Sequence, residues 1–266
     1  FCAAKRNRTN VGCCLQCARI LDIYVSFIMA RITSDLLRQA ADDGDYMNSY
    51  VLSFRYQHIA EISGLEKCVR LRSLDLSCND VVAISNLECL SDLRELKLYA
   101  NKVVSIQGLE KTTSLQHLYL EDNAIESISG LATLRKLTTL YLHRNCIQSI
   151  SGLENLRSLT SLDLSGNHIK KMTGLSSLTA LEELFLNDNE LNAIEGLDRC
   201  ELLQEIQLSG NAITTVAGLP KLKKLTYLRL NNNLISDLAA LPLLPRLSEL
   251  HVAYNRISSL SPLPRL

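Results

Sequence analysis

The sequence predicts an α/β solenoid of about ten 22-residue repeats, with a parallel β-sheet on its concave side. The first observation is an asparagine that recurs every 22 residues without interruption, at Asn79, Asn101, Asn123, Asn145, Asn167, Asn189, Asn211, Asn233 and Asn255. The second is a set of apolar residues at fixed distances from each Asn, which around Asn167 are Leu159, Leu162, Leu164, Ile169, Met172, Leu175 and Leu178. Such a period indicates that every repeat builds the same unit and stacks on its neighbours.

Each repeat is expected to place a strand on one side of the coil and an irregular return on the other. The apolar residues five and three positions before the Asn are two apart, so both point to one side of a short strand. The apolar residues after the Asn follow a three-residue period, which predicts a 3₁₀ or irregular helical segment on the convex side. The Asn amide can satisfy buried turn backbone groups, so stacked copies are expected to form a ladder.

Glycine recurs seven positions after the Asn site, at Gly64, Gly108, Gly130, Gly152, Gly174, Gly196 and Gly218. Asn86 takes this position once. Both residue types tolerate a left-handed backbone, which predicts a sharp turn at this point of each coil.

Three segments follow from the repeat frame. Residues 1–28 do not continue it and contain four of the nine cysteines, so we expect a leader that is non-native or disordered, with Met29 as the true start. Residues 29–48 are expected to form an N-terminal helical cap that Gly44 ends. Residues 49–266 form the repeat domain, in which Gln57 occupies the Asn position of a degenerate first repeat. The chain stops at Leu266 in repeat frame, so either a C-terminal part is missing or the last coil is exposed.

The cap is expected to cover the open edge of the first coil. Thr33 or Ser34 can serve as the N-cap of its helix, and Asp35 suits the positive end of the helix dipole. The apolar residues of this segment fall on one face of the helix: Ile32, Leu36, Leu37, Ala40 and Ala41.

Charge and cysteine usage indicate an intracellular protein without a metal. The chain has 28 basic and 28 acidic residues, so net charge alone favours neither a nucleic-acid nor a membrane partner. Cys68 and Cys200 occupy apolar positions of the repeat and the other thiols are scattered, which is typical of reduced cysteines. Cys14 and Cys17 have the spacing of half a metal or redox motif, but no second pair accompanies them.

Catalytic motifs are not found. The sequence has no Gly-rich phosphate loop, no nucleophile elbow and no paired-Cys zinc site, so we expect no catalytic residue, no cofactor and no enzyme activity. Glu121 and His143 fall at the same offset on neighbouring coils and are expected to form a surface ion pair. The lysine clusters at 170–171 and 221–224 are interpreted as solvated convex charges and not as a nucleic-acid stripe.

The concave face is the candidate site. Outward positions four and two residues before the Asn bring aromatic and acidic side chains into rows, and interfaces favour exposed aromatics as anchors. The alternative is that the aromatics stack across strands and serve only the sheet. We expect a monomer that binds a folded protein, and neither nucleic acid nor membrane, through these partner-binding residues: Tyr99, Tyr119, Glu121, Tyr141, His143, Asp163, Glu183 and Phe185.

The frame LxxLxxLxLxxNxIxxIxGL, which runs from Leu134 to Leu153, resembles the 22-residue leucine-rich repeat class typified by regulatory subunit 7 of protein phosphatase 1. The resemblance covers residues 49–266 and implies an intracellular, cytoplasmic or nuclear, right-handed curved solenoid without catalytic activity. In that regulator, aromatic and acidic residues of the concave face hold the phosphatase catalytic subunit. Tyr141, Asp163 and Phe185 form a similar row here. This chain departs from that protein in having no Trp, fewer repeats and no C-terminal cap.

A second resemblance concerns the segment RITSDLLRQAADDGD before the first repeat. It is similar to the Ile-Thr-x-x-Leu opening of ciliary leucine-rich repeat proteins, which implies an axonemal or dynein-assembly component and a ciliary location. A third hypothesis is an enzyme whose catalytic domain lies further downstream. A plain cap, a coiled coil or a catalytic domain after the repeats would distinguish the three.

Overall fold

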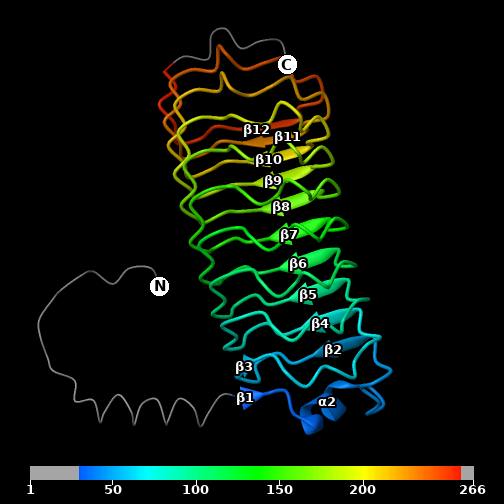
Figure 1. Cartoon of the computed structure of the whole chain (residues 1–266). Helices are drawn as coiled ribbons and strands as arrows, with labels where there is room; N and C mark the ends of the chain where they lie inside the picture. The colour runs from blue at the N-terminus through cyan, green and yellow to red at the C-terminus, as the bar shows by residue number, and fades with distance from the viewer. Residues whose placement is uncertain (1–29, 259–266) are drawn as a thin grey trace, which may run out of the picture.

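A computed structural model of the protein describes residues 30–258, and Figure 1 shows a solenoid with one strand in each coil. The main sheet has ten parallel strands in the order β12-β11-β10-β9-β8-β7-β6-β5-β4-β2. The strands are β2 (Val51–Ser53), β4 (Ser73–Asp75), β5 (Glu95–Lys97), β6 (His117–Tyr119), β7 (Thr139–Tyr141), β8 (Ser161–Asp163), β9 (Glu183–Phe185), β10 (Glu205–Gln207), β11 (Tyr227–Arg229) and β12 (Glu249–His251). The predicted α/β solenoid with a parallel sheet is confirmed.

The strands of the main sheet pair in a register that equals the 22-residue period of the sequence. Each residue pairs with the residue 22 positions later, as Leu118 does with Leu140 and Tyr119 with Tyr141. Equivalent positions of successive coils therefore stack in columns about 4.8 Å apart. A column of side chains on the surface can be identified directly from the sequence.

The apolar positions of the repeat fill one continuous core. Leu162 and Leu164 on the strand side and Met172 and Leu175 on the return side are all 0% exposed. Thr112 replaces an apolar residue in one coil and is buried too, but its hydroxyl donates to the carbonyl oxygen of Leu109 at 2.9 Å. No coil could bury these side chains alone, so each coil depends on its neighbours for stability.

The convex side is irregular. Isolated turns follow each other there, as in the hydrogen bonds from Leu134 N to Leu131 O and from Leu137 N to Leu134 O, both 3.0 Å. One bond per three residues is too sparse for a 3₁₀-helix. Among the described residues of the repeats, the irregular form of the predicted return is found and the 3₁₀ form is not.

The asparagine ladder joins each coil to the one before it. Oδ1 of Asn145 accepts the N–H of Ile125 at 2.9 Å. Nδ2 of Asn145 donates to the carbonyl oxygens of Leu120 and Leu142, both at 3.0 Å. The same bonds recur at all nine Asn positions, so the ladder expected from the sequence is confirmed.

The glycines seven positions after each Asn site form a column in the structure. They are required because the backbones of neighbouring coils come close together there, as well as by turn geometry. Gly130 has a φ of 77°, and a Cβ there would overlap the carbonyl oxygen of Ile106 in the preceding coil. Gly218 lacks the left-handed φ that the sequence predicts, yet a Cβ there would overlap the carbonyl oxygen of Ile194. Contact between coils is therefore the requirement that these two positions share.

A second set of residues with left-handed backbone conformation, one in each coil, was not predicted. The residue just before each Asn has a positive φ, including non-glycine residues such as Ala100 (φ 54°) and Arg144 (φ 54°). This position turns the chain from the strand into the ladder. Its residue types vary between coils, so no pattern of residue types predicted it.

The N-terminal cap begins with strand β1 (Ala30–Arg31) and continues into helix α2 (Ser34–Ala40). Thr33 is the N-cap, and its side chain accepts the N–H of Leu36 at 3.3 Å. Leu37 is buried against the first coil. Strand β1 pairs with β3 (Ile59–Glu61) in a separate two-stranded sheet that the sequence did not predict. The expected leader at 1–28 and the end of the chain at Leu266 lie outside the described residues.

Candidate functional site

The outward side chains of the main sheet, at six, four and two residues before each Asn, form what we call the concave face. Strands β6, β7 and β9 end in the aromatic residues Tyr119, Tyr141 and Phe185, and β8 ends in Asp163. The remaining predicted residues lie in the same three columns, with Glu183 at the start of β9 and the others two residues beyond their strands: Tyr99, Glu121 and His143. The structure thus brings all eight candidates onto one face.

The aromatic side chains of this row are half-buried and not exposed as the sequence analysis expected. The rings of Tyr119 and Tyr141 meet edge to face, with centroids 5.4 Å apart. Nζ of Lys97 lies 5.8 Å from the ring centroid of Tyr119. Side chains only one strand apart cover each other, so cross-strand stacking accounts for part of the row. Phe185 is flanked in the register by Asp163 and Gln207.

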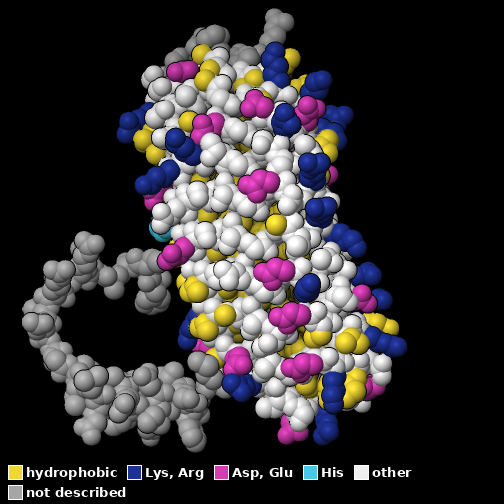
Figure 2. All heavy atoms as spheres, in the orientation of Figure 1, with side chains coloured by type: hydrophobic (Ala, Val, Ile, Leu, Met, Phe, Trp, Pro, Cys, Tyr) yellow, Lys and Arg dark blue, Asp and Glu magenta, His cyan; other side chains and the backbone are white. Residues whose placement is uncertain are grey.

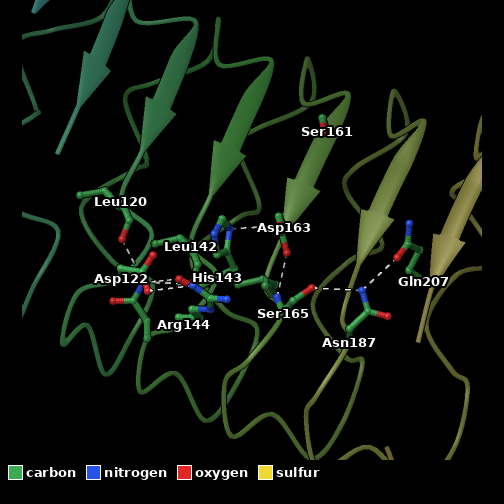
Figure 3. A network of polar contacts seen from close by, with 12 residues as sticks. Leu120, Asp122, Leu142, His143, Arg144, Ser161, Asp163, Ser165, Asn187 and Gln207 are labelled. Atoms are coloured by element: carbon green, nitrogen blue, oxygen red, sulfur yellow. Dashed lines mark hydrogen bonds and ion pairs between the residues drawn. The ribbon is translucent and has the colours of Figure 1, made fainter. Parts of the chain in front are cut away.

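His143 forms its ion pair with Asp163 and not with Glu121, which corrects the expected pairing. Nδ1 of His143 lies 3.1 Å from Oδ2 of Asp163 on the following coil (Figure 3). This close contact with Asp163 raises the pKa of His143. Burial alone would raise the pKa of Asp163, but the contacts with His143 and the Ser165 N–H outweigh burial and hold that pKa below its ordinary value. Both pKa shifts favour the charged form of the pair.

Glu121 is left with an unsatisfied carboxylate oxygen. Its Oε2 atom is buried and has no hydrogen-bond partner in the described part of the chain. Burial raises the pKa of this carboxyl, and the nearby His143 only partly offsets that effect. A buried carboxylate oxygen without a donor is costly, so the Glu121 side chain would gain by turning outward to a donor on a bound partner.

A polar network continues from Asp163 across the next two coils (Figure 3). Oδ1 of Asp163 accepts the N–H of Ser165 at 2.9 Å, and Nδ2 of Asn187 donates to Oε1 of Gln207 at 3.2 Å. On the neighbouring column, the Ser161 hydroxyl donates to Glu183 at 2.8 Å. These Ser, Asn and Gln residues were not among the predicted partner-binding residues, although their offsets place them in the same columns. They hold the acidic side chains in fixed positions.

The middle of the concave face is acidic. Between Lys97 and Arg229, the three outward columns contain no Lys or Arg. They contain four carboxylates: Glu121, Asp163, Glu183 and Glu205. His143 compensates one of them at 3.1 Å. A surface with this charge attracts a cationic partner and repels an anionic one.

The described residues also include thiols and potential metal ligands. No group of three or more His, Cys, Asp or Glu side chains there could hold a metal ion. Cys68 and Cys200 are free thiols in the core, and burial raises the pKa of each to about 11. Cys14 and Cys17 lie outside the described residues. None of the described helices has the length and apolar character needed to cross a membrane.

The coil register, the asparagine ladder and the single strand in each coil define a solenoid repeat protein. Family models described as leucine rich repeat match residues 113–169 and 67–82, and a model of two leucine rich repeats matches residues 157–199 and 201–243. The chain is a leucine-rich repeat protein. None of these matches is to a catalytic family. No curated protein sequence matches the chain.

Solved structures with the same fold include two internalins from Listeria monocytogenes. One, inlF, is 27% identical with a TM-score of 0.67, and the alignment covers 86% of this chain and 76% of that one. The other, internalin C2, is 26% identical with a TM-score of 0.67, and the alignment covers 73% and 92%.

A third solved structure contains a bound partner. It is the ectodomain of the receptor kinase GASSHO1/SCHENGEN3 from Arabidopsis thaliana in complex with CASPARIAN STRIP INTEGRITY FACTOR 2. It is 26% identical with a TM-score of 0.59, and the alignment covers 78% of this chain and 26% of the receptor.

Proposed function

We propose that the protein is a non-catalytic scaffold whose concave face, from Tyr99 to Glu205, binds a folded protein. The observation on which this rests is the buried Oε2 of Glu121, which has no donor among the described residues and lies on the same face as Tyr119 and Tyr141. Aromatic side chains beside an incompletely satisfied polar group favour an interface more than a surface that serves only the fold. Leucine-rich repeat domains generally bind protein partners, which supports this function.

The partner surface is expected to be basic. A Lys or Arg side chain can donate to Glu121 and adds attraction from Asp163, Glu183 and Glu205. These carboxylates set the association rate and its salt dependence more than the affinity. The aromatic residues are expected to supply most of the affinity, about 2 kcal/mol or more each when truncated to Ala.

For the identity of the partner, we propose the catalytic subunit of a protein phosphatase. The support is the row Tyr141, Asp163 and Phe185, whose members pair directly in the register of β7, β8 and β9. An axonemal or dynein-assembly partner is the alternative. The Ile-Thr-x-x-Leu opening favours it less, because Ile32 is buried and Thr33 caps helix α2. Those residues are therefore explained by the fold. Under either alternative we propose an intracellular monomer.

The test is titration of the whole chain with purified catalytic subunit of protein phosphatase 1. We expect binding that weakens at least about tenfold in the double variant Tyr141→Ala, Phe185→Ala. Lys170→Ala, on the opposite side of the Asn ladder, is the matched control and should bind as the unmodified chain does. The thermal midpoint of each variant is measured first, because Tyr141 also contacts Tyr119.

Absence of binding would exclude the phosphatase and leave the concave face to be tested with axonemal and dynein-assembly proteins. The concave assignment itself is wrong if the double variant retains every partner isolated with the intact chain while Lys170→Ala loses them. Binding that does not change with salt concentration would contradict the role given to the carboxylates.

A further inference from the structure

A second charged surface lies along the side of the solenoid where the chain returns to each strand. We call it the basic edge and define it as the six residues that precede each strand from β4 to β12. Because the coils are in register, these segments stack one above another along the whole repeat domain. The edge includes thirteen of the chain's 28 Lys and Arg residues: Lys67, Arg70, Arg72, Arg94, Lys111, Arg135, Lys136, Arg157, Arg199, Lys221, Lys223, Lys224 and Arg246.

Acidic residues are rare on the basic edge. The same segments contain three of them, Asp92, Glu182 and Glu201. All thirteen basic side chains are exposed. Figure 2 shows Lys and Arg side chains gathered along the side of the solenoid that lies on the right of the view. The whole chain has a formal net charge of zero, so this edge reflects a segregation of charge within the fold.

The basic side chains of this edge have no ion-pair partners among the described residues. None of the thirteen has a carboxylate oxygen within 4.0 Å. The opposite edge, beside the Asn ladder, is different, because Lys102 there lies 2.7 Å from Asp80 and Arg144 lies 3.5 Å from Asp122. Lys170 also has a partner, Glu190, at 3.7 Å. Among the described residues, ion pairs within 4.0 Å are thus found beside the Asn ladder and not on the basic edge, where Asp198 and Glu201 line a shallow pocket with Lys221 and Lys223 without pairing at that distance.

This arrangement changes how the lysines at 221–224 are interpreted. From the sequence they were expected to be isolated solvated charges on the convex side. The structure aligns Lys221, Lys223 and Lys224 with ten further basic residues along one edge. A surface with interspersed charges of both signs is sufficient for solubility. A long surface with charges of one sign additionally attracts an oppositely charged partner.

We propose that the basic edge binds an acidic, extended polypeptide segment that runs along the axis of the solenoid. Nine coils stacked about 4.8 Å apart span roughly 38 Å, which an extended chain of about eleven residues covers. A flexible acidic chain can place its carboxylates opposite the basic clusters and pass the coil of Glu182, which has no basic residue on this edge.

Two other polyanions fit the edge less well. The segments of the basic edge contain no aromatic residue or histidine, and Tyr50, one coil before them, is exposed but already stacks with Arg72 at 4.7 Å, so the edge lacks the row of aromatic platforms of a single-strand binder. A duplex has one phosphate charge per roughly 1.7 Å and would bring many of them against the acidic side chains beside the edge, such as Glu66, Glu110 and Glu154. A lipid surface also fits less well, because the edge has no continuous apolar strip to insert into it. The exposed aliphatic side chains Val69 and Leu243 lie far apart, in the first and last coils of the edge.

The experiment uses the whole chain and a fluorescent peptide of about twelve residues, mostly Glu and Asp, with an isosteric Gln and Asn peptide as the control ligand. Fluorescence anisotropy is recorded at low and at physiological salt. We expect the acidic peptide to bind, its affinity to fall about tenfold or more with salt, and the neutral peptide not to bind. The triple variant Lys221→Glu, Lys223→Glu, Lys224→Glu should weaken binding about tenfold or more.

The matched control is Lys170→Glu, Lys171→Glu, which changes the same kind of charge on another face and should bind within about twofold of the unmodified chain. If the triple variant does not fold, Arg135→Glu, Lys136→Glu tests the middle of the same edge. Equal binding of the neutral peptide, or equal loss in the control variant, would overturn the proposal. Tighter binding of duplex DNA or of phosphatidylserine vesicles than of the acidic peptide would overturn it as well. Loss of this binding with the concave partner retained would show that the two surfaces are separate.

Discussion

Nδ1 of His143 on one coil lies 3.1 Å from Oδ2 of Asp163 on the next, and both side chains are largely shielded from solvent. The contact joins two adjacent coils across the concave face. Because the pKa of His143 is raised and that of Asp163 is lowered, the charged pair contributes to the stability of the fold as well as to the charge of the candidate site.

The pair predicts a particular dependence of stability on pH. The contribution of His143 is complete below its unfolded pKa of about 6.5 and is lost as pH rises through its raised folded pKa. That of Asp163 is present above about pH 3.9 and is lost as pH falls through its lowered folded pKa. The raised pKa of Glu121 has the same sign, since its contribution to stability falls as pH rises above about 4.3. We therefore expect the free energy of unfolding to decline from pH 6 to pH 8.

His143→Gln tests this dependence. The variant should lose about 1–2 kcal/mol at pH 6, because it leaves a buried carboxylate with a weaker partner. Its unfolding free energy should decline less between pH 6 and pH 8. Urea unfolding at a series of pH values measures both effects. If the unfolding free energy of the variant declines between pH 6 and pH 8 as steeply as that of the unmodified chain, another group is responsible for the pH dependence.

Asn145 tests the ladder. In Asn145→Ala the N–H of Ile125 loses its side-chain partner, whereas the carbonyl oxygens of Leu120 and Leu142 each keep one of two Asn donors. Leaving a buried backbone N–H unsatisfied should cost about 1–3 kcal/mol. The control is Asn155→Ala, since Asn155 is exposed and makes one bond, to Ala132 O at 3.1 Å. Equal loss in the two variants, measured by urea unfolding, would contradict the importance of the ladder. A chelator should leave the unfolding of the intact chain unchanged.

Gly130 tests whether backbone contact between coils is essential. Gly130→Ala must adopt a left-handed φ and must also move the carbonyl of Ile106. Gly44 has nearly the same φ, 76°, but nothing lies within 4 Å of an added Cβ. Gly44→Ala should therefore cost only the left-handed strain, about 1–2 kcal/mol. Gly130→Ala should cost clearly more or prevent folding. Similar thermal midpoints for the two variants would show that the coils separate easily.

The repeat period was sufficient to predict the strands, the core and the ladder, because one frame governs all of them. Leu162, Asn145 and Gly130 each occupy a position whose chemistry every coil repeats. The cap helix was also predictable, because Thr33 and the apolar residues after it have local signals.

Features that depend on the pairing of particular neighbours could not be predicted. The frame places Glu121 and His143 at one offset, but it does not reveal that His143 turns toward Asp163 on the following coil. Strand β1 depends on contact with Glu61, thirty residues away from Arg31. The left-handed φ of Ala100 and Arg144 follows from coil closure and not from residue type. The basic edge was missed because its thirteen residues occupy several offsets and so form no obvious repeat in the sequence.

The aromatic row should divide into residues that stabilise the fold and residues that do not. The ring of Tyr141 meets the ring of Tyr119 edge to face at 5.4 Å, while the described residues give Phe185 no such ring contact. Edge-to-face pairs contribute about 0.5–1.5 kcal/mol beyond area burial. Tyr141→Ala should therefore lower the free energy of unfolding by about that much more than Phe185→Ala does. Urea unfolding of these two variants, of Tyr119→Ala and of the double variant Tyr119→Ala, Tyr141→Ala measures both the difference and the coupling between the two rings. If Phe185→Ala is the more destabilising of the two, Phe185 serves the fold, and its value as an anchor for a partner would have to be established from binding alone.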